Sequence, residues 1–169
     1  GMFGRHGIAV EPLYIAGRSI NLLLSGDVQF GFTGGPQTVH ARLSGADLIT
    51  IAGLNRLGQM IAAHPSIRSP QDLIGKKVGI GVFGTTADYG MRLGLRKLNL
   101  RPNKEVTFIQ VGDVPARIAA VTSGAVHAVV LSSFDKHFLE QHGLRLLAET
   151  EDIDFIGSGI MVTESFARA

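Results

Sequence analysis

The chain has 169 residues, of which 45% are hydrophobic and 18% charged, a composition typical of one globular domain or two small lobes. It contains no cysteine, which excludes a disulfide scaffold, a thiolate metal site, an iron–sulfur cluster and a cysteine nucleophile. Its 16 basic and 14 acidic residues are interspersed and give a net charge of +2, so we predict no nucleic-acid partner. No apolar run reaches the ~18–20 residues of a membrane span, and no signal peptide is visible.

A helix that ends at a glycine and is followed at once by a strand is the recurrent unit of this sequence. The helical spacings end at Gly26, Gly45, Gly124 and Gly143, and the β-rich runs after them are 28–32, 48–51, 126–131 and 144–147. Between these units, Ser69, Pro70 and Asp72 fit the N-cap, N1 and N3 positions of a short helix that stops at Gly75. A strand at 78–82, a helix at 87–98, a strand at 106–111 and helices at 116–123 and 134–141 complete the pattern. Alternating helices and strands predict an α/β fold with a mostly parallel sheet covered by helices.

Two of these units match in residues as well as in pattern. Residues 25–28 and 123–126 both read Ser-Gly-x-Val before a strand that ends in a loop of small residues. The match suggests two structurally related halves. We place the boundary between two lobes near residues 55–59, where an apolar strand gives way to Asn, Arg and Gly.

Four loops of small residues follow strands and lead into helices, at 33–36, 83–86, 112–115 and 132–133. In an open α/β sheet, ligands bind beyond the carboxyl ends of the strands, beside helix N-termini. The loops therefore indicate a site for a small polar or anionic ligand, although the same residue types also serve as ordinary helix caps. They contain no Lys or Arg, so a strongly anionic ligand would depend on helix N-termini alone.

Three aspartates, Asp88, Asp113 and Asp135, lie near these loops. Each either stabilises a helix N-terminus through the helix dipole or receives an amine or amide group of the ligand. Both roles remain open for each residue.

Other site types are disfavoured. Residues 79–84 fit GxGxxG, but Glu105 precedes the next strand and Asp113 comes too late to be the acidic residue of a dinucleotide site. We interpret Gly79 and Gly81 as strand residues that a neighbouring backbone approaches closely. The six histidines form no ligand cluster, and no GxSxG motif is present, so we predict no metal, no cofactor and no hydrolase triad.

Several motifs together resemble a known family, and they occur in the expected order over nearly the whole chain. They are residues 22–31 (LLLSGDVQFG), 33–36 (TGGP), 68–79 (RSPQDLIGKKVG), 83–86 (FGTT) and 114–124 (VPARIAAVTSG). The sequence is similar to the extracytoplasmic substrate-binding proteins of ABC importers for nitrate, sulfonates, taurine and thiamine-pyrimidine precursors.

The resemblance implies a two-lobed fold of the type II periplasmic-binding-protein kind, with a small solute held between lobes that close by hinge motion and no catalysis. It implies a periplasmic or extracytoplasmic location and a membrane permease as partner. Carried over onto matching loops, the ligand-binding residues would be Thr33, Gly34, Gln37, Asn55, Gly84, Thr85, Thr86 and Ser132, to which we add Asp113 and Ser133 from the neighbouring loops.

The departures from the family concern both ends. Family members have a strand and a ligand-contacting loop before residues 3–7, and helices beyond residues 163–166. The resemblance therefore implies truncation at both ends, with residues 1–56 as a partial first lobe, 57–164 as the second lobe and 165–169 as the start of the return. An incomplete first lobe would leave sheet edges unpaired, and we expect copies of the chain to associate through it.

Two further functions stay open at this point. The first is an enzyme on the same fold, of the menaquinone-pathway or thiamine-pyrimidine-synthase type. The synthase type uses a cysteine-rich segment, and the absence of cysteine speaks against it. The second is the ligand-sensing domain of a signalling receptor.

Overall fold

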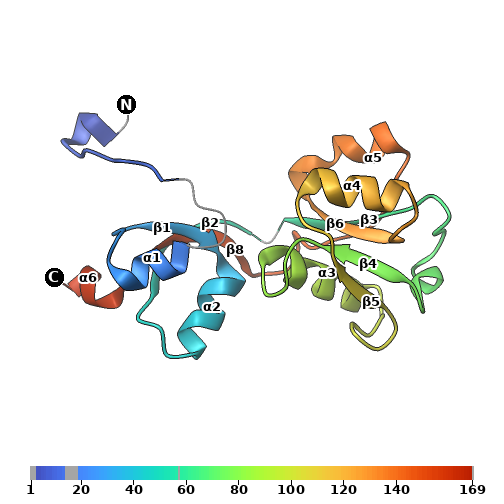
Figure 1. Cartoon of the computed structure of the whole chain (residues 1–169), viewed down its shortest axis with the longest axis horizontal. Helices are drawn as coiled ribbons and strands as arrows, with labels where there is room; N and C mark the ends of the chain where they lie inside the picture. Colours follow the sequence, from blue (N-terminus) through green and yellow to red (C-terminus); the bar gives the residue numbers. More distant parts are fainter. Residues whose placement is uncertain (1–2, 14–18, 57, 169) are drawn as a thin grey trace.

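Two sheets, each with its own helices, make up two lobes joined by a narrow waist (Figure 1). The computed structural model describes residues 3–13, 19–56 and 58–168. Its strands are β1 (Gly31–Gly34), β2 (Ile49–Arg56), β3 (Gln59–Ala63), β4 (Lys77–Ile80), β5 (Thr107–Gln110), β6 (Ala128–Ser132), β7 (Arg145–Glu149) and β8 (Ile156–Val162). Its α-helices are α1 (Ser19–Ser25), α2 (Gly35–Leu43), α3 (Thr86–Lys97), α4 (Val114–Thr122), α5 (His137–His142) and α6 (Glu164–Arg168). Its short 3₁₀ turns are η1 (Phe3–His6), η2 (Pro70–Leu73) and η3 (Ser133–Asp135).

The described strands form a three-stranded sheet in the order β1-β8-β2 and a five-stranded sheet in the order β5-β4-β6-β3-β7. We predicted mostly parallel sheets, and this was wrong: β4 is parallel to β5 and β6, but β8 is antiparallel to β1 and β2, and β3 is antiparallel to β6 and β7. The antiparallel strands β3 and β8 are those that follow a crossing between the lobes. Each enters its new sheet in the direction opposite to the strands on either side.

In both lobes, the strand that follows a crossing is inserted between two strands of the sheet that it joins. In the first lobe, α1, β1, α2 and β2 follow in chain order, and β8 lies between the two strands. In the second lobe, α4, β6, α5 and β7 follow in the same order, and β3 lies between the two strands. The paired Ser-Gly-x-Val units stand at the same point of both halves, between the first helix and the first strand.

The chain returns to the first sheet earlier than we predicted. We placed residues 57–164 in the second lobe, but β8 pairs with β1 and β2. The first crossing lies between the end of β2 at Arg56 and the start of β3 at Gln59, and includes Leu57, which is outside the described residues. We therefore propose a first lobe of residues 19–56 and 156–168 and a second lobe of residues 58–155.

Local sequence signals place most helix ends correctly. Gly124, after α4, and Gly143, after α5, have φ of 76° and 62°, the left-handed region that glycine adopts without a Cβ clash. The backbone N–H of Ser69 donates to Asp72 Oδ2 at 2.9 Å, as the predicted helix start at η2 requires. Three elements differ most: the strand predicted from residue 28 begins at Gly31, the strand predicted at 48–51 extends to Arg56 as β2, and the helix predicted at 134–141 is split into η3 and α5.

The second lobe carries the larger core. Ile61 and Ala63 of β3 pack with Met91 and Leu95 of α3 on one face of the five-stranded sheet. On the opposite face, alternate strand residues pack against α4 and α5. The first lobe has a much smaller core of Leu23, Leu48 and Met161. Helices therefore cover both faces of the five-stranded sheet in the second lobe, and the sheet is buried on both sides.

Candidate functional site

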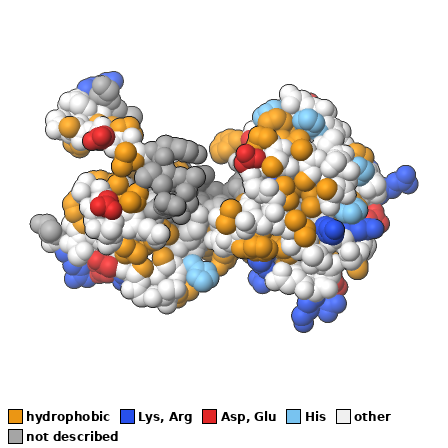
Figure 2. All heavy atoms as spheres, in the orientation of Figure 1, with side chains coloured by type: hydrophobic (Ala, Val, Ile, Leu, Met, Phe, Trp, Pro, Cys, Tyr) orange, Lys and Arg blue, Asp and Glu red, His pale blue; other side chains and the backbone are white. Residues whose placement is uncertain are grey.

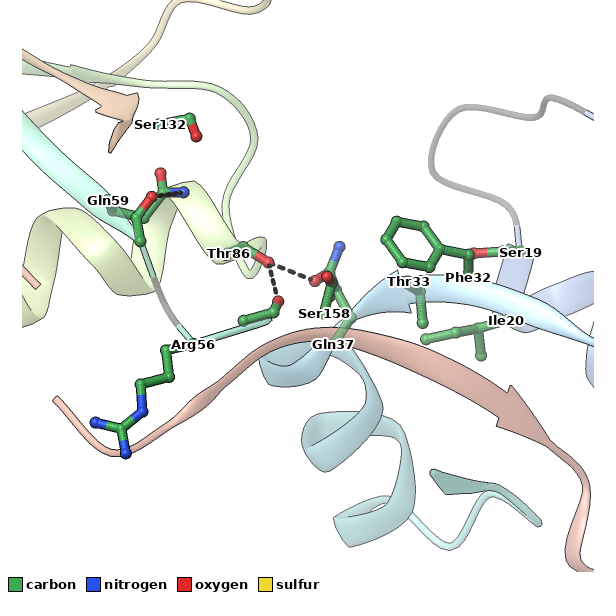
Figure 3. Close-up of a pocket in the computed structure, with 13 residues that line it drawn as sticks. Ser19, Ile20, Phe32, Thr33, Gln37, Arg56, Gln59, Thr86, Ser132 and Ser158 are labelled. Carbon is green, nitrogen blue, oxygen red and sulfur yellow. Dashed lines mark hydrogen bonds between the residues drawn. The ribbon is translucent and has the colours of Figure 1, made fainter. Parts of the chain in front are cut away.

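A pocket of about 360 Å³ lies between the two lobes, at the waist (Figure 3). The first lobe lines it with Ser19, Ile20, Phe32, Thr33, Gly34, Gln37, Arg56, Gly157 and Ser158, and the second with Gly58, Gln59, Thr86 and Ser132. Hydroxyls, amides and glycines dominate this lining, and no carboxylate belongs to it among the described residues. The volume suits a small organic solute.

Two helices point their N-termini into this pocket from opposite lobes. Gly34 and Gln37 mark the start of α2, and Thr86 is the first residue of α3. The N-cap residues, Gly34 and Thr85, make no side-chain capping hydrogen bond to their helices. The backbone N–H groups of both first turns are therefore left to other acceptors, and the positive ends of both helix dipoles favour an anionic one.

Glycines allow the first helix to approach its neighbours closely. A Cβ on Gly35 would lie 2.0 Å from the carbonyl oxygen of Ile156, at the start of β8. A Cβ on Gly34 would lie 2.1 Å from both Gln37 Oε1 and Thr86 Oγ1. At residue 35 the backbone of β8 occupies the space of a side chain, and at residue 34 the ends of the Gln37 and Thr86 side chains occupy it. The predicted loop 33–36 therefore favours glycine at both positions.

Thr86 joins the lobes directly. Its hydroxyl lies 3.4 Å from Gln37 Oε1 and 3.4 Å from the carbonyl oxygen of Gly157, both in the first lobe. Figure 3 shows the two contacts converging on the hydroxyl.

One basic side chain borders the pocket, although the four predicted loops contain none. Arg56 ends β2 beside the waist, and its guanidinium lies 3.9 Å from Asp154 Oδ1. Both side chains are largely exposed, so this ion pair is weak. In Figure 3 the guanidinium points away from Gln37 and Thr86.

Of the predicted site residues, the structure brings Thr33, Gly34, Gln37, Thr86 and Ser132 together around the pocket. Asn55 lies in β2 opposite Ser158, but its side chain is outside the described part of the chain. Four predicted residues do not line the pocket: Gly84, Thr85, Asp113 and Ser133.

Local hydrogen bonds account for these four residues. The Thr85 hydroxyl donates to Val82 O at 2.6 Å, and Gly84 N donates to Asp88 Oδ2 at 2.9 Å. The Asp113 carboxylate accepts from Ala116 N at 3.0 Å and so caps its own helix, α4. Ser133 N donates to Gly58 O at 3.0 Å, which ties its loop to the waist.

Asp88 and Asp135 also accept hydrogen bonds from nearby groups of the chain. Asp88 is buried, and its Oδ1 accepts from Arg92 Nε at 2.7 Å within α3. Asp135 Oδ2 accepts from Ser132 N at 3.3 Å. Both carboxylates hold loops beside the pocket in place.

Sequence reasoning missed the pocket residues of α1, the waist and β8. Ser19 and Ile20 come from α1, Gly58 and Gln59 from the first crossing, and Gly157 and Ser158 from β8. The signal for β8 was the apolar run 160–162, which follows two glycines at 157 and 159. Nothing local could show that this strand lies in the first sheet.

No group of three or more His, Asp or Glu side chains in the described ranges could hold a metal ion. No helix in the same ranges is long and apolar enough to cross a membrane. On the face shown in Figure 2, Lys and Arg side chains are dispersed over both lobes without a single basic patch.

A comparison with family models identifies the family of this chain. The family model described as NMT1/THI5 like matches residues 1–168. The taurine-binding periplasmic protein of Escherichia coli (strain K12) is 26% identical over 137 residues, which are 79% of this chain and 41% of that protein.

Two solved structures share the fold. The alkanesulfonate-binding protein SsuA from Xanthomonas axonopodis pv. citri, bound to MOPS, matches with a TM-score of 0.72 and 23% identity, over 88% of this chain and 52% of that one. The periplasmic aliphatic sulphonate binding protein SsuA from Escherichia coli matches with a TM-score of 0.73 and 24% identity, over 88% of this chain and 49% of that one. These matches confirm the two-lobed α/β periplasmic-binding-protein fold. The chain spans about half the length of the proteins it matches.

Proposed function

The chain belongs to the NMT1/THI5-like family, and on that premise we propose that it holds a small organic anion of the sulfonate type between its lobes, as the solute-binding part of an ABC importer. The proposal includes a location outside the cytoplasmic membrane and a membrane permease as partner. It is supported by the relatives, which are described as taurine-, alkanesulfonate- and sulphonate-binding proteins.

The lining of the pocket carries this proposal. Thr33, Gln37 and Ser132 offer hydroxyl and amide groups, the N-termini of α2 and α3 have no side-chain cap, and Arg56 is the one charged residue among the described residues of the lining. A sulfonate has three acceptor oxygens and one negative charge, so donors from several directions and a single cation complement it. A ligand cation would find no carboxylate among the described lining residues.

We further propose that the chain binds without catalysis. The relatives named above are described as binding proteins. The carboxylates of Asp88 and Asp113, beside the loops that lead into α3 and α4, are engaged by Arg92 Nε and Ala116 N, and neither lines the pocket. No observation favours the biosynthetic-enzyme or sensor-domain alternatives.

A calorimetric titration of the purified chain tests the proposal. The panel is ethanesulfonate, taurine, MOPS, nitrate and a neutral pyrimidine, and a thermal-unfolding scan accompanies each titration. A ligand at a hundredfold excess over its dissociation constant stabilises the folded state by about 2.7 kcal/mol, enough to shift the unfolding temperature. We expect a sulfonate to bind and the pyrimidine not to bind. Binding of the pyrimidine alone would overturn the proposed ligand class.

Arg56 provides a matched pair of variants for the same titrations. Arg56→Lys keeps the charge beside the pocket, whereas Arg56→Gln removes it. We expect the glutamine variant to bind the sulfonate more weakly, and the difference from wild type to shrink in high salt because an exposed charge is screened.

Self-association through the first lobe also remains a proposal. The small core of that lobe leaves Phe32, Ile51 and Leu54 half-exposed or more. Sedimentation velocity at two concentrations tests it, and a monomer at both would overturn it.

A further inference from the structure

Thr86 and Gln37 meet across the boundary between the lobes, over a glycine. Thr86 Oγ1 belongs to the second lobe and lies 3.4 Å from Oε1 of Gln37 in the first. Gly34 lies under both oxygens, and a Cβ there would approach each of them to 2.1 Å. The missing side chain at residue 34 therefore leaves the space in which the two groups meet.

This contact places the oxygen of the Gln37 amide toward Thr86. A threonine hydroxyl has one hydrogen to donate, and the two acceptors at 3.4 Å, Gln37 Oε1 and Gly157 O, share that hydrogen. With Oε1 turned to the Thr86 hydroxyl, the two Nε2 hydrogens of Gln37 point the other way. Figure 3 shows the Gln37 nitrogen on the side of the amide away from Thr86, and Gln37 lines the pocket.

We propose that Thr86 is a positioning residue that determines specificity: from the second lobe it holds the Gln37 amide of the first lobe with its donor side toward the pocket. The inference rests on the proposed function, because the donor serves an anionic oxygen of the ligand. It also couples specificity to closure, since Gln37 has this partner only when the lobes are as close as they are here.

The first test needs no ligand. In a ¹⁵N–¹H spectrum, the Gln37 side-chain NH₂ pair is identified by its loss in Gln37→Ala. We expect Thr86→Val, which keeps the shape and removes the hydroxyl, to move this pair, and Thr86→Ser to leave it near its wild-type position. Gly34→Ala should also move it, because its methyl group displaces the ends of two flexible side chains. An unmoved pair in Thr86→Val would overturn the proposal.

Two controls exclude a general change in folding. The hydroxyl of Thr122 on α4 is exposed and bonds within its own helix, so Thr122→Val removes a hydroxyl far from the pocket. A Cβ on Gly53 would meet Ile156 only at 3.8 Å, an ordinary contact, so Gly53→Ala adds a methyl group without a clash. Neither should move the Gln37 pair.

The second test measures how Thr86 acts on binding, with ethanesulfonate and taurine as probes. We expect Thr86→Val to weaken ethanesulfonate binding roughly tenfold, because the Gln37 donor that bonds to the charged ligand is no longer held, and Thr86→Ser to restore it. In the Gln37→Ala background, Thr86→Val should have no further effect, because it acts through Gln37. Equal losses in both backgrounds would show direct ligand contact and overturn the positioning role.

A charge substitution tests which face of the amide meets the ligand. Gln37→Glu replaces the Nε2 donor by a carboxylate oxygen, so both sulfonates should bind far more weakly. Tighter binding of taurine, which carries an ammonium group, would show that Gln37 serves as an acceptor and overturn the proposal. If wild type binds neither sulfonate, the proposed ligand class fails, while the spectra still decide whether Thr86 orients Gln37.

Discussion

Gln59 and Thr150 hydrogen-bond to each other in both directions, and this clasp joins the two crossings between the lobes. Gln59 N donates to Thr150 Oγ1 at 3.1 Å, and Thr150 N donates to Gln59 O at 2.9 Å. Gln59 begins β3, where the chain enters the second lobe, and Thr150 follows β7, where it leaves. The two connections are therefore fixed to each other at the second lobe, and bending between the lobes falls on the residues beyond this clasp.

Thr150→Val should destabilise the chain by about 1–3 kcal/mol, because it keeps the volume of a fully buried side chain and leaves the Gln59 N–H without its acceptor. Urea unfolding followed by circular dichroism measures the loss. The exposed Thr122→Val serves as control and should lie within about 0.5 kcal/mol of wild type. Equal stabilities of the two variants would contradict the structural role of the clasp.

Helix α3 lies against β3 through two glycines one turn apart. A Cβ on Gly90 would lie 2.6 Å from Gln59 Cγ, and one on Gly94 would lie 2.7 Å from Ile61 Cδ1. We expect Gly90→Ala to destabilise the chain by about 1–3 kcal/mol through overpacking, although alanine favours a helix over glycine by up to about 1 kcal/mol. Thermal unfolding of Gly90→Ala is compared with that of Gly53→Ala, whose added methyl group makes only an ordinary contact with Ile156 at 3.8 Å. A more stable Gly90→Ala would show that the helix can move away freely.

The elements predicted well from sequence are those whose signals are local. Asp72 caps the backbone three residues before it, and Gly143 ends its own helix, so neither depends on distant neighbours. The loop at Thr86 was found because strand, small residues and helix follow one another there.

The elements missed depend on partners far along the chain. Gly157 and Gly159 make β8 look like a loop, but a Cβ on Gly159 would lie 2.6 Å from Ala52 O in the neighbouring strand. The glycine is required by a contact between residues about a hundred positions apart, which no local pattern carries. The pocket residues contributed by β8 and by the waist were therefore missed, whereas Thr33, Gln37 and Ser132, at strand ends, were found.

Asp88 connects the stability of α3 to the loop beside the pocket. This buried carboxylate accepts from Arg92 Nε at 2.7 Å and from Gly84 N at 2.9 Å. Asp88→Asn keeps one acceptor and removes the charge, and we expect a loss of about 2 kcal/mol in the free energy of unfolding. Arg92→Met, which keeps the apolar stem, should lose at least as much, because it leaves the buried Asp88 carboxylate without its cation. A stability of Arg92→Met equal to that of wild type would contradict the role of this ion pair.

His127 gives the second lobe a pH dependence near neutrality. Burial, the first cause, and the positive charges of Lys76, His64 and Lys77 lower the pKa of its imidazole below the ordinary 6.5. Its Nδ1 is buried and has no hydrogen-bond partner in the described part of the chain. The unfolded chain therefore takes up a proton at a higher pH than the folded chain does. The stability associated with neutral His127 is fully present above 6.5 and is lost as the pH falls through the lowered folded-state pKa.

We accordingly expect urea unfolding midpoints of the wild type to fall between about pH 7 and pH 5, and His127→Gln to flatten that fall because glutamine does not titrate there. His142→Gln is the matched control, since that histidine lies at the exposed end of α5. It should retain the wild-type slope. A slope unchanged in His127→Gln would place the titrating group elsewhere, whereas a slope lost in both variants would mean that no single histidine controls it.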